Sequence, residues 1–296
     1  MAYYLFFLTF VNAIVRPADW GLEMRQKLAE KVVFVTGASS GIGEALVRQA
    51  ARQGAAVVLA ARRLERIARV AAEIEAAGGR ASAVSCDVTR DGELESAVAH
   101  GLERFGRLDI AVANAGISVN GCVADLSVDD FRRQLDTNVL GVVRTVHATL
   151  PALRATRGAL AFLGSTNGYL SLPGYSPYCA SKHAVRALAD CLRHELARSG
   201  VSVTHIAPGF VESEIRVVGD DGLVRADAVD PIPHWLQRSA AGAARQMLRA
   251  IRRRRAETII SGHAWLAIFL SRHAPWLVSA GLRVGREPLM KAARST

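Results

Sequence analysis

The sequence predicts an α/β protein: a doubly wound, parallel, seven-stranded sheet with helices on both faces. Two observations predict this fold. Short apolar runs alternate along the chain with longer amphipathic stretches, and the apolar runs are continuous, as in strands that are buried on both faces. The 296 residues are 50% hydrophobic and 22% charged, which excludes a disordered chain and allows one large domain.

The first strand is expected at residues 31–36 (KVVFVT), and a helical pattern follows it over residues 41–53. Helical stretches of about 12 to 25 residues separate the later strands, with stop signals at Gly78, Gly106 and Gly200. The helix before the last strand is expected to end in Arg255. The six later strands are expected at residues 56–61, 81–85, 108–113, 159–164, 201–207 and 257–261.

The positive charge is concentrated near the C-terminus. Residues 245–296 hold eleven basic and two acidic residues, so they carry +9 of the formal net charge of +10. A nearly neutral body argues against a nucleic-acid partner. The cysteines show neither CxxC nor ligand spacing, which predicts reduced thiols in a cytoplasmic protein and no metal site; they are Cys86, Cys122, Cys179 and Cys191.

A glycine-rich loop, residues 37–43 (GASSGIG), follows the first predicted strand and opens a helix. Its glycines allow a tight turn, and the helix N-terminus supplies unpaired N–H groups and the positive end of the helix dipole. In this strand–loop–helix context the pattern predicts a site for the pyrophosphate of a dinucleotide, with a plain turn as the alternative. The loop residues expected at the cofactor are Gly37, Ser39, Ser40, Gly41, Ile42 and Gly43.

Further motifs follow the later strands. They are Asn114-Ala115-Gly116, Asn138 in the next helix, Ser165, Tyr178-Cys179-Ala180-Ser181-Lys182, and Pro208-Gly209. With the glycine loop, these motifs resemble the short-chain dehydrogenase/reductase family over about residues 31–262, which implies a Rossmann-type fold. The resemblance implies a catalytic tetrad in which a serine orients the substrate, a tyrosine exchanges the proton, a lysine binds the nicotinamide ribose and an asparagine holds a water. The matching residues are Ser165, Tyr178, Lys182 and Asn138.

The pair of Tyr178 and Lys182 also has a chemical rationale of its own. A phenol with an ordinary pKa near ~10 is a poor acid–base catalyst at neutral pH. At positions i and i+4 of a helix the two side chains share a face, and a cation at that distance favours the phenolate. The chain has 4 lysines against 33 arginines, so a lysine here favours a role for a compact ammonium. The alternatives are an ordinary surface pair and, for Asn138, a structural polar contact within the helix.

The end of the second predicted strand favours NADP(H) over NAD(H). In NAD-binding proteins of this fold, an acidic residue about twenty residues beyond the glycine loop accepts a hydrogen bond from the ribose 2′-OH. Here the strand has no such residue and ends Ala60-Ala61-Arg62-Arg63. A guanidinium suits a 2′-phosphate, so Arg62 and then Arg63 are the candidates, with arginines that solvate a helix start as the alternative. The resemblance also implies cofactor contacts from Asp87, Val88, Asn114, Gly116, Tyr178, Lys182, Pro208, Gly209 and Ser213.

Substrate selection is expected in residues 167–177 and 214–240. The second stretch mixes apolar and acidic side chains, as in a mobile lid. A small hydrophobic alcohol or carbonyl compound is therefore predicted, with ordinary lid packing as the alternative. His183 and His205 are expected to be structural. The first stretch has no fixed charge and offers Tyr169, Leu170, Leu172 and Tyr175.

Both ends depart from the predicted catalytic domain, residues 31–262. The extension at 1–30 begins with fifteen almost wholly apolar residues, too few for a membrane-spanning helix. The extension at 263–296 holds apolar runs with tryptophans, flanked by arginines, as at a membrane interface. We therefore expect peripheral contact of both termini with the cytoplasmic face of a membrane. Packing on the domain or on a second subunit of a homodimer or homotetramer is the alternative.

The motifs together predict an NADP-dependent oxidoreductase. It moves a hydride between the nicotinamide and a carbonyl or secondary alcohol carbon, while Tyr178 exchanges the proton. A dinucleotide-binding scaffold or sensor without turnover is the alternative. The usual mark of such a protein is the loss of the tyrosine or the lysine, and this chain has both.

Overall fold

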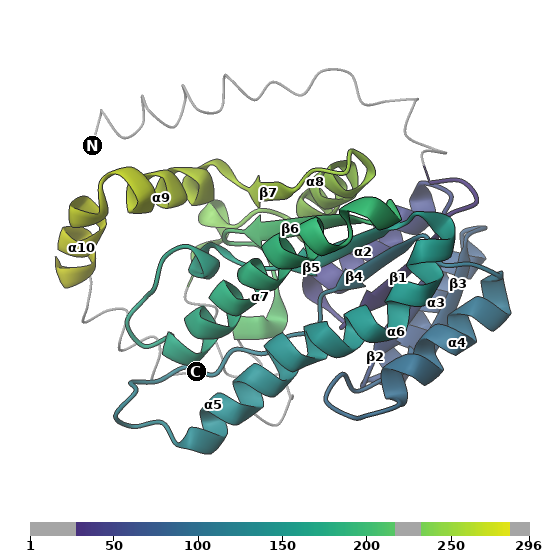
Figure 1. The fold of residues 1–296 in the computed structure, drawn as a ribbon, viewed down its shortest axis with the longest axis horizontal. Helices are drawn as coiled ribbons and strands as arrows, with labels where there is room; N and C mark the ends of the chain where they lie inside the picture. The colour runs from purple at the N-terminus through teal and green to yellow at the C-terminus, as the bar shows by residue number, and fades with distance from the viewer. Residues whose placement is uncertain (1–27, 217–231, 285–296) are drawn as a thin grey trace.

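The strands form one parallel sheet in the order β3-β2-β1-β4-β5-β6-β7 (Figure 1). The structure is a computed structural model that describes residues 28–216 and 232–284. The predicted fold class is confirmed. Each predicted strand is present, with ends that differ by no more than two residues. The strands are β1 (Val32–Thr36), β2 (Ala56–Ala61), β3 (Arg80–Ser85), β4 (Ile110–Ala113), β5 (Ala159–Leu163), β6 (Ser202–Pro208) and β7 (Glu257–Ile260).

Helices connect consecutive strands. The helix before β7 ends at Arg252 rather than at the predicted Arg255, because Arg254 adopts a left-handed backbone with φ of 50°. The helices are α2 (Gly41–Arg52), α3 (Leu64–Ala76), α4 (Glu93–Phe105), α5 (Val128–Leu135), α6 (Gly141–Thr156), α7 (Ser176–Glu195), α8 (Ala240–Arg252), α9 (Gly262–His273) and α10 (Pro275–Val284). Shorter turns are η1 (Asp136–Leu140), η2 (Thr166–Gly168), η3 (Ala197–Ser199), η4 (Glu214–Arg216) and η5 (His234–Leu236).

The centre of the sheet is buried on both faces, which is why β1, β2, β4 and β5 are largely apolar, whereas the edge strands β3 and β7 are partly exposed and include polar residues. Successive side chains of a strand point to opposite faces. Along β1, Val33 and Val35 pack into the core formed with α2, α3 and α8, whereas Val32 and Phe34 pack into the core formed with α4, α6 and α7. Figure 1 shows α6 and α7 crossing in front of the sheet.

The strand order reverses between β1 and β4, which are paired neighbours. Asn114 braces this junction: its Nδ2 donates to the carbonyl oxygens of Thr36 over 2.8 Å and Gly37 over 3.0 Å. The Thr36 hydroxyl accepts in turn from the N–H groups of Asn114 and Ala115. In an open parallel sheet, ligands bind outside the carboxyl ends of the strands at this reversal.

The region predicted to be interfacial forms α9 and α10, which lie at the opposite end of the molecule from α3 and α4 (Figure 1). Four of their large apolar side chains are exposed: Trp265 by 56%, Phe269 by 42%, Trp276 by 69% and Leu277 by 44%. Among the helices of the described part, none is long and apolar enough to cross a membrane. Outside the described residues lie most of the N-terminal extension (1–27), part of the expected lid (217–231) and the end of the tail (285–296).

Candidate active site

A cleft of about 780 Å³ opens at the carboxyl ends of the strands. Two predicted site residues do not line it: Gly41 faces another hollow, and Asn138 is buried. The other predicted residues all line the cleft; they are Gly37, Ser39, Ser40, Ile42, Gly43, Arg62, Arg63, Asp87, Val88, Asn114, Gly116, Ser165, Tyr178, Lys182, Pro208, Gly209 and Ser213.

The glycine loop has no room for side chains at two positions. Gly37 has φ of 65°, and a Cβ there would come within 2.7 Å of the Ala115 Cα. A Cβ on Gly43 would overlap the Gly37 carbonyl oxygen. At the start of α2, Ser40 makes no side-chain capping hydrogen bond. The loop is thus a tight backbone turn that leads into a helix N-terminus, as an anion site requires.

A guanidinium lies against this loop. Arg63 donates from Nε and Nη2 to the Ser39 hydroxyl over 3.1 and 2.9 Å, and from Nη2 to the Ser40 hydroxyl over 2.8 Å. Arg62 is exposed and lines the same cleft. The structure therefore brings both predicted arginines to the cleft and holds Arg63, the second candidate, on the loop itself.

Glu214 begins the stretch expected to select the substrate, but neither its pairing with Arg63 nor the contribution of Arg66 was predicted from the sequence. Glu214, in η4, accepts from Arg63 Nη1 over 3.1 Å, and Arg66 Nη1 lies 3.0 Å from both Glu214 carboxylate oxygens. Burial raises the pKa of Glu214, but the hydrogen bonds from Arg63 and Arg66 outweigh it and the net shift is downward. The partners are about 150 residues apart in sequence, so no local pattern could have paired them.

Tyr178 and Lys182 lie together on α7. Lys182 is buried, with 4% exposed, and its Nζ is 5.5 Å from the centre of the Tyr178 ring. The Nζ donates to the Leu163 carbonyl oxygen over 2.8 Å. Burial lowers the pKa of Lys182 from 10.5 to about 8. At neutral pH the cleft therefore still holds an ammonium beside a phenol.

Asn138 lies behind the cleft in the π-helical turn η1, where 1% of it is exposed. Its Oδ1 accepts from the Ile117 N–H over 2.9 Å, and its Nδ2 donates to the Ile117 carbonyl over 3.0 Å and to the Ser181 hydroxyl over 3.1 Å. A Cβ on Gly116 would lie 3.2 Å from Asn138 Oδ1 and 3.8 Å from Lys182 Nζ. The amide therefore links the Ile117 backbone to α7, which differs from the contact within the helix given as the alternative, and its expected role in holding a water stays a prediction.

Ser165 follows β5 and begins η2, where its hydroxyl accepts from the Asn167 N–H over 3.1 Å. The preceding residue, Gly164, packs so closely on His205 that a Cβ would overlap the His205 Nε2. His205 therefore backs the turn that carries Ser165, a contact that sequence analysis missed. Gly164 follows β5 and His205 lies on β6, about forty residues later in the sequence. No local sequence pattern could have predicted their contact.

His205 is the buried member of a partly buried polar cluster. The Tyr169 hydroxyl donates to Glu257 and lies 3.2 Å from His205 Nδ1. The guanidinium of Arg186 is 4.1 Å from the Tyr169 ring centre, and that of Arg272, on α9, is 5.2 Å away. Burial lowers the pKa of His205 to about 4, so the imidazole is neutral. The Tyr169 ring thus joins this cluster, and none of the four side chains expected to shape the substrate site from residues 167–177 lines the cleft.

The remaining predicted residues form loops after β3 and β6. Asp87 accepts from the N–H and hydroxyl of Thr89 over 3.0 and 2.8 Å. Gly209 donates its N–H to the Ile260 carbonyl over 3.0 Å, and the Ser213 hydroxyl accepts from the Ile215 N–H over 3.3 Å. These hydrogen bonds fix two loops that both line the cleft.

Two buried thiols flank the same region. Cys86 lines the cleft, and Cys179 follows Tyr178 on α7. Burial raises the pKa of the Cys86 thiol to about 12 and also raises that of Cys179. Neither sulfur is therefore a thiolate nucleophile at neutral pH.

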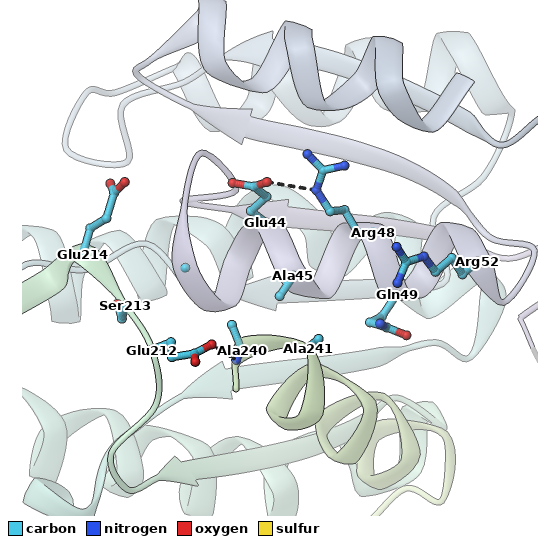
Figure 2. Close-up of a pocket in the computed structure, with 11 residues that line it drawn as sticks. Glu44, Ala45, Arg48, Gln49, Arg52, Glu212, Ser213, Glu214, Ala240 and Ala241 are labelled. Atoms are coloured by element: carbon cyan, nitrogen blue, oxygen red, sulfur yellow. Dashed lines mark hydrogen bonds and ion pairs between the residues drawn. The ribbon is translucent and has the colours of Figure 1, made fainter. Parts of the chain in front are cut away.

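A second hollow, of about 440 Å³, lies between α2 and the start of α8 (Figure 2). Gly41 lines it, together with Arg48. Arg48 is paired with Glu44 over 2.9 Å and with Glu73 over 2.7 Å, so its charge is already balanced. None of the predicted catalytic residues lies there.

Comparisons with known proteins agree with this geometry. Residues 31–221 match the family model of short chain dehydrogenases. An uncharacterised oxidoreductase of Mycobacterium tuberculosis is 48% identical over 202 residues, 68% of this chain and 77% of that protein. A short chain dehydrogenase/reductase from Burkholderia phymatum, solved with NAD, superposes with a TM-score of 0.75 at 26% identity, over 85% of this chain and 96% of that one. An alcohol dehydrogenase from Thermococcus sibiricus, complexed with 5-hydroxy-NADP, superposes with a TM-score of 0.68 at 29% identity, over 78% of this chain and 95% of that one.

Proposed function

The chain belongs to the short-chain dehydrogenase/reductase family and is an NAD(P)-dependent oxidoreductase, and on this premise we propose that it uses NADP(H) on a hydrophobic carbonyl compound or secondary alcohol. One observation carries the proposed chemistry: the buried Lys182 ammonium lies beside the Tyr178 phenol on the cleft that Ser165 also lines. A phenol next to a fixed cation can give and regain a proton at neutral pH.

Each catalytic residue has a proposed task. A bound dinucleotide would supply or accept the hydride. The Tyr178 hydroxyl gives its proton to the carbonyl oxygen in reduction and takes one from the alcohol in oxidation. Lys182 stabilises the phenolate, and the Ser165 hydroxyl holds the substrate oxygen in place. Asn138 fixes the Ile117 backbone next to Lys182 and so keeps the cleft floor in shape.

The residues present fit a dinucleotide. Gly37 and Gly43 leave a cradle that a Cβ would fill, and α2 begins without a side-chain cap. A pyrophosphate at this position would receive backbone N–H groups and the positive end of the helix dipole. Residues on this turn and the arginines beside it are therefore proposed to hold the phosphates.

The preference for NADP rests on the two arginines after β2. The similar solved proteins carry NAD in one case and 5-hydroxy-NADP in the other, so the fold accepts both kinds of cofactor. Here β2 ends without an acidic residue, and Arg63 lies on the glycine loop with Arg62 exposed next to it. A guanidinium binds phosphate through parallel N–H donors, so we assign the 2′-phosphate to Arg63, with Arg62 as its neighbour.

The substrate class follows from apolar side chains on the cleft. Ile117, Val211 and Ile215 line it together with Ser165 and Tyr178. Apolar walls with a few convergent polar groups are typical of sites for hydrophobic small molecules. These side chains support a hydrophobic alcohol or carbonyl compound as the substrate.

We further propose a cytoplasmic enzyme that contacts a membrane peripherally through α9 and α10. The rings of Trp265 and Phe269 stack at 5.3 Å between centres and are exposed, and Trp276 is exposed on the next helix. Arg272 and Arg283 on the same two helices are exposed as well. Exposed tryptophans beside basic residues match a headgroup boundary, where each basic residue contributes about 1 kcal/mol on an anionic surface.

The substitution Tyr178→Phe tests the proposed chemistry. It removes one hydroxyl, so NADPH binding should stay within about twofold while turnover falls by at least ~10³-fold. NADPH oxidation is followed against a panel of steroid, retinoid, fatty-acyl and aromatic carbonyl compounds, and binding is measured by fluorescence titration. Unchanged turnover in the variant would refute the role of Tyr178.

A further inference from the structure

We propose that Glu214 sets the balance between NADP and NAD, because its carboxylate competes with a 2′-phosphate for the guanidinium of Arg63. This inference rests on the proposed function, in which Arg63 binds that phosphate. It adds a specificity-determining residue from η4, in the loop after β6.

The hydrogen bonds of Arg63 show the competition. Its Nε and Nη2 are engaged with the hydroxyls of Ser39 and Ser40. Its Nη1 donates to Glu214 over 3.1 Å. A guanidinium has five N–H donors in a fixed fork, so little of this fork is left for a further anion. A 2′-phosphate must therefore displace Glu214 or lie beside it.

Both outcomes cost binding energy for the phosphorylated cofactor alone. A displaced carboxylate loses its contacts with Arg63 and Arg66, and a retained one repels the phosphate. NAD carries a hydroxyl instead, which can donate to a carboxylate. Glu214 thus offers, from the β6 side, the kind of acceptor that β2 lacks. Arg63 and Glu214 side chains are 31% and 32% exposed, so water screens the competition and its effect is moderate.

The neighbouring acid Glu212 supplies a matched control. Figure 2 shows Glu212 pointing toward Ala240 at the start of α8, whereas Glu214 points away from α8. Glu212 accepts from the Ala240 N–H over 3.2 Å and is exposed. It has the same charge and lies on the same loop, but it is directed at a different element.

The experiment measures direct binding of NADP and NAD to the full chain by calorimetry, for the wild type and three variants. Glu214→Gln should tighten NADP binding about tenfold and leave NAD binding unchanged or weaker. Glu212→Gln should change neither. Arg63→Ala should weaken NADP binding and leave NAD binding within about twofold. Adenosine 2′,5′-bisphosphate and AMP probe the adenosine end alone. Glu214→Gln should tighten binding of the bisphosphate and should not tighten binding of AMP.

The outcomes separate this inference from the proposed function. If the wild type binds neither dinucleotide, the proposed function fails. If it binds both, and Glu214→Gln leaves the ratio of the two dissociation constants unchanged, the Glu214 inference is overturned while the function stands. Weaker NADP binding in Glu214→Gln would also overturn it, since Glu214 would then position Arg63 for the phosphate. Glu214→Ala, checked by circular dichroism, repeats the test should the glutamine variant fold poorly.

Discussion

Burial of Lys182 in the cleft destabilises the folded chain. Burial lowers its pKa to about 8, whereas the same side chain in the unfolded chain titrates near 10.5. The unfolded state therefore binds this proton more tightly than the folded state. Burial of the charged lysine therefore lowers the free energy of unfolding. This destabilisation is fully present below pH 8 and disappears as the pH rises from 8 to 10.5. The gain is functional, since the buried ammonium is the group beside Tyr178.

The substitution Lys182→Met should accordingly stabilise the protein. At pH 7, without dinucleotide, we expect the free energy of unfolding to rise by on the order of 2 kcal/mol, after the loss of the hydrogen bond to Leu163. The gain should shrink toward pH 10.5, and turnover should be lost. Urea unfolding at several pH values measures it. A variant that is less stable than the wild type at pH 7 would contradict this account.

Single residues could be predicted from sequence where the pattern is local. Tyr178 and Lys182 are one helical turn apart, so their common face follows from helix geometry. The pairing of Glu214 with Arg63 could not be found in this way, because the two residues come from different βα units and only the assembled sheet brings them together. The same holds for His205, which backs Gly164 from an adjacent strand.

Among the elements, the strand and helix pattern was predictable because the central strands β1, β2, β4 and β5 are buried on both faces and read as apolar runs. The ends of elements were less predictable. Arg254 adopts a left-handed backbone conformation that its sequence does not demand, and it donates to the carbonyls of Gly200 and Arg157. Those tertiary hydrogen bonds, and not local propensity, accompany the end of α8.

The loop before α2 should tolerate no side chain at Gly43. In Gly43→Ala the new Cβ would overlap the Gly37 carbonyl, so the turn must shift. We expect dinucleotide affinity to fall at least ~100-fold and the free energy of unfolding to drop by about 2 kcal/mol. Gly281→Ala is the control, since a Cβ there meets nothing within 4 Å. Calorimetry and urea unfolding measure both effects, and equal behaviour of the two variants would exclude the steric explanation.

At the level of the whole molecule, the fold could be predicted, whereas the sequence left two alternatives for α9 and α10, exposure at an interface and packing on the domain. The sequence showed apolar runs with tryptophans and arginines, which fit a buried segment as well as an exposed one. In the structure Ala264 and Ile268 face inward, while Trp265 and Trp276 are exposed. The apolar side chains of α9 are thus divided between packing on the domain and exposure to solvent.

The double substitution Trp265→Glu/Trp276→Glu should release the protein from anionic vesicles. Two carboxylates would replace the exposed rings, so we expect binding to phosphatidylserine vesicles to fall at least ~10-fold in a flotation assay. Trp235→Glu is the matched control, because Trp235 is 77% exposed but lies in η5. If the wild type ignores vesicles and the double variant changes a dimer into a monomer, this face is a subunit interface instead.

The two buried thiols have a consequence for how the protein meets oxidants. Cys86 and Cys179 lie next to the chemistry, but both stay protonated because burial raises the pKa of each. Peroxide and alkylating reagents attack thiolates, so they find no target there. Cys191, exposed on α7, is accessible in their place. A maleimide dye should therefore mark the outer surface of α7 and leave catalysis intact, which gives a built-in attachment point for following cofactor capture in real time.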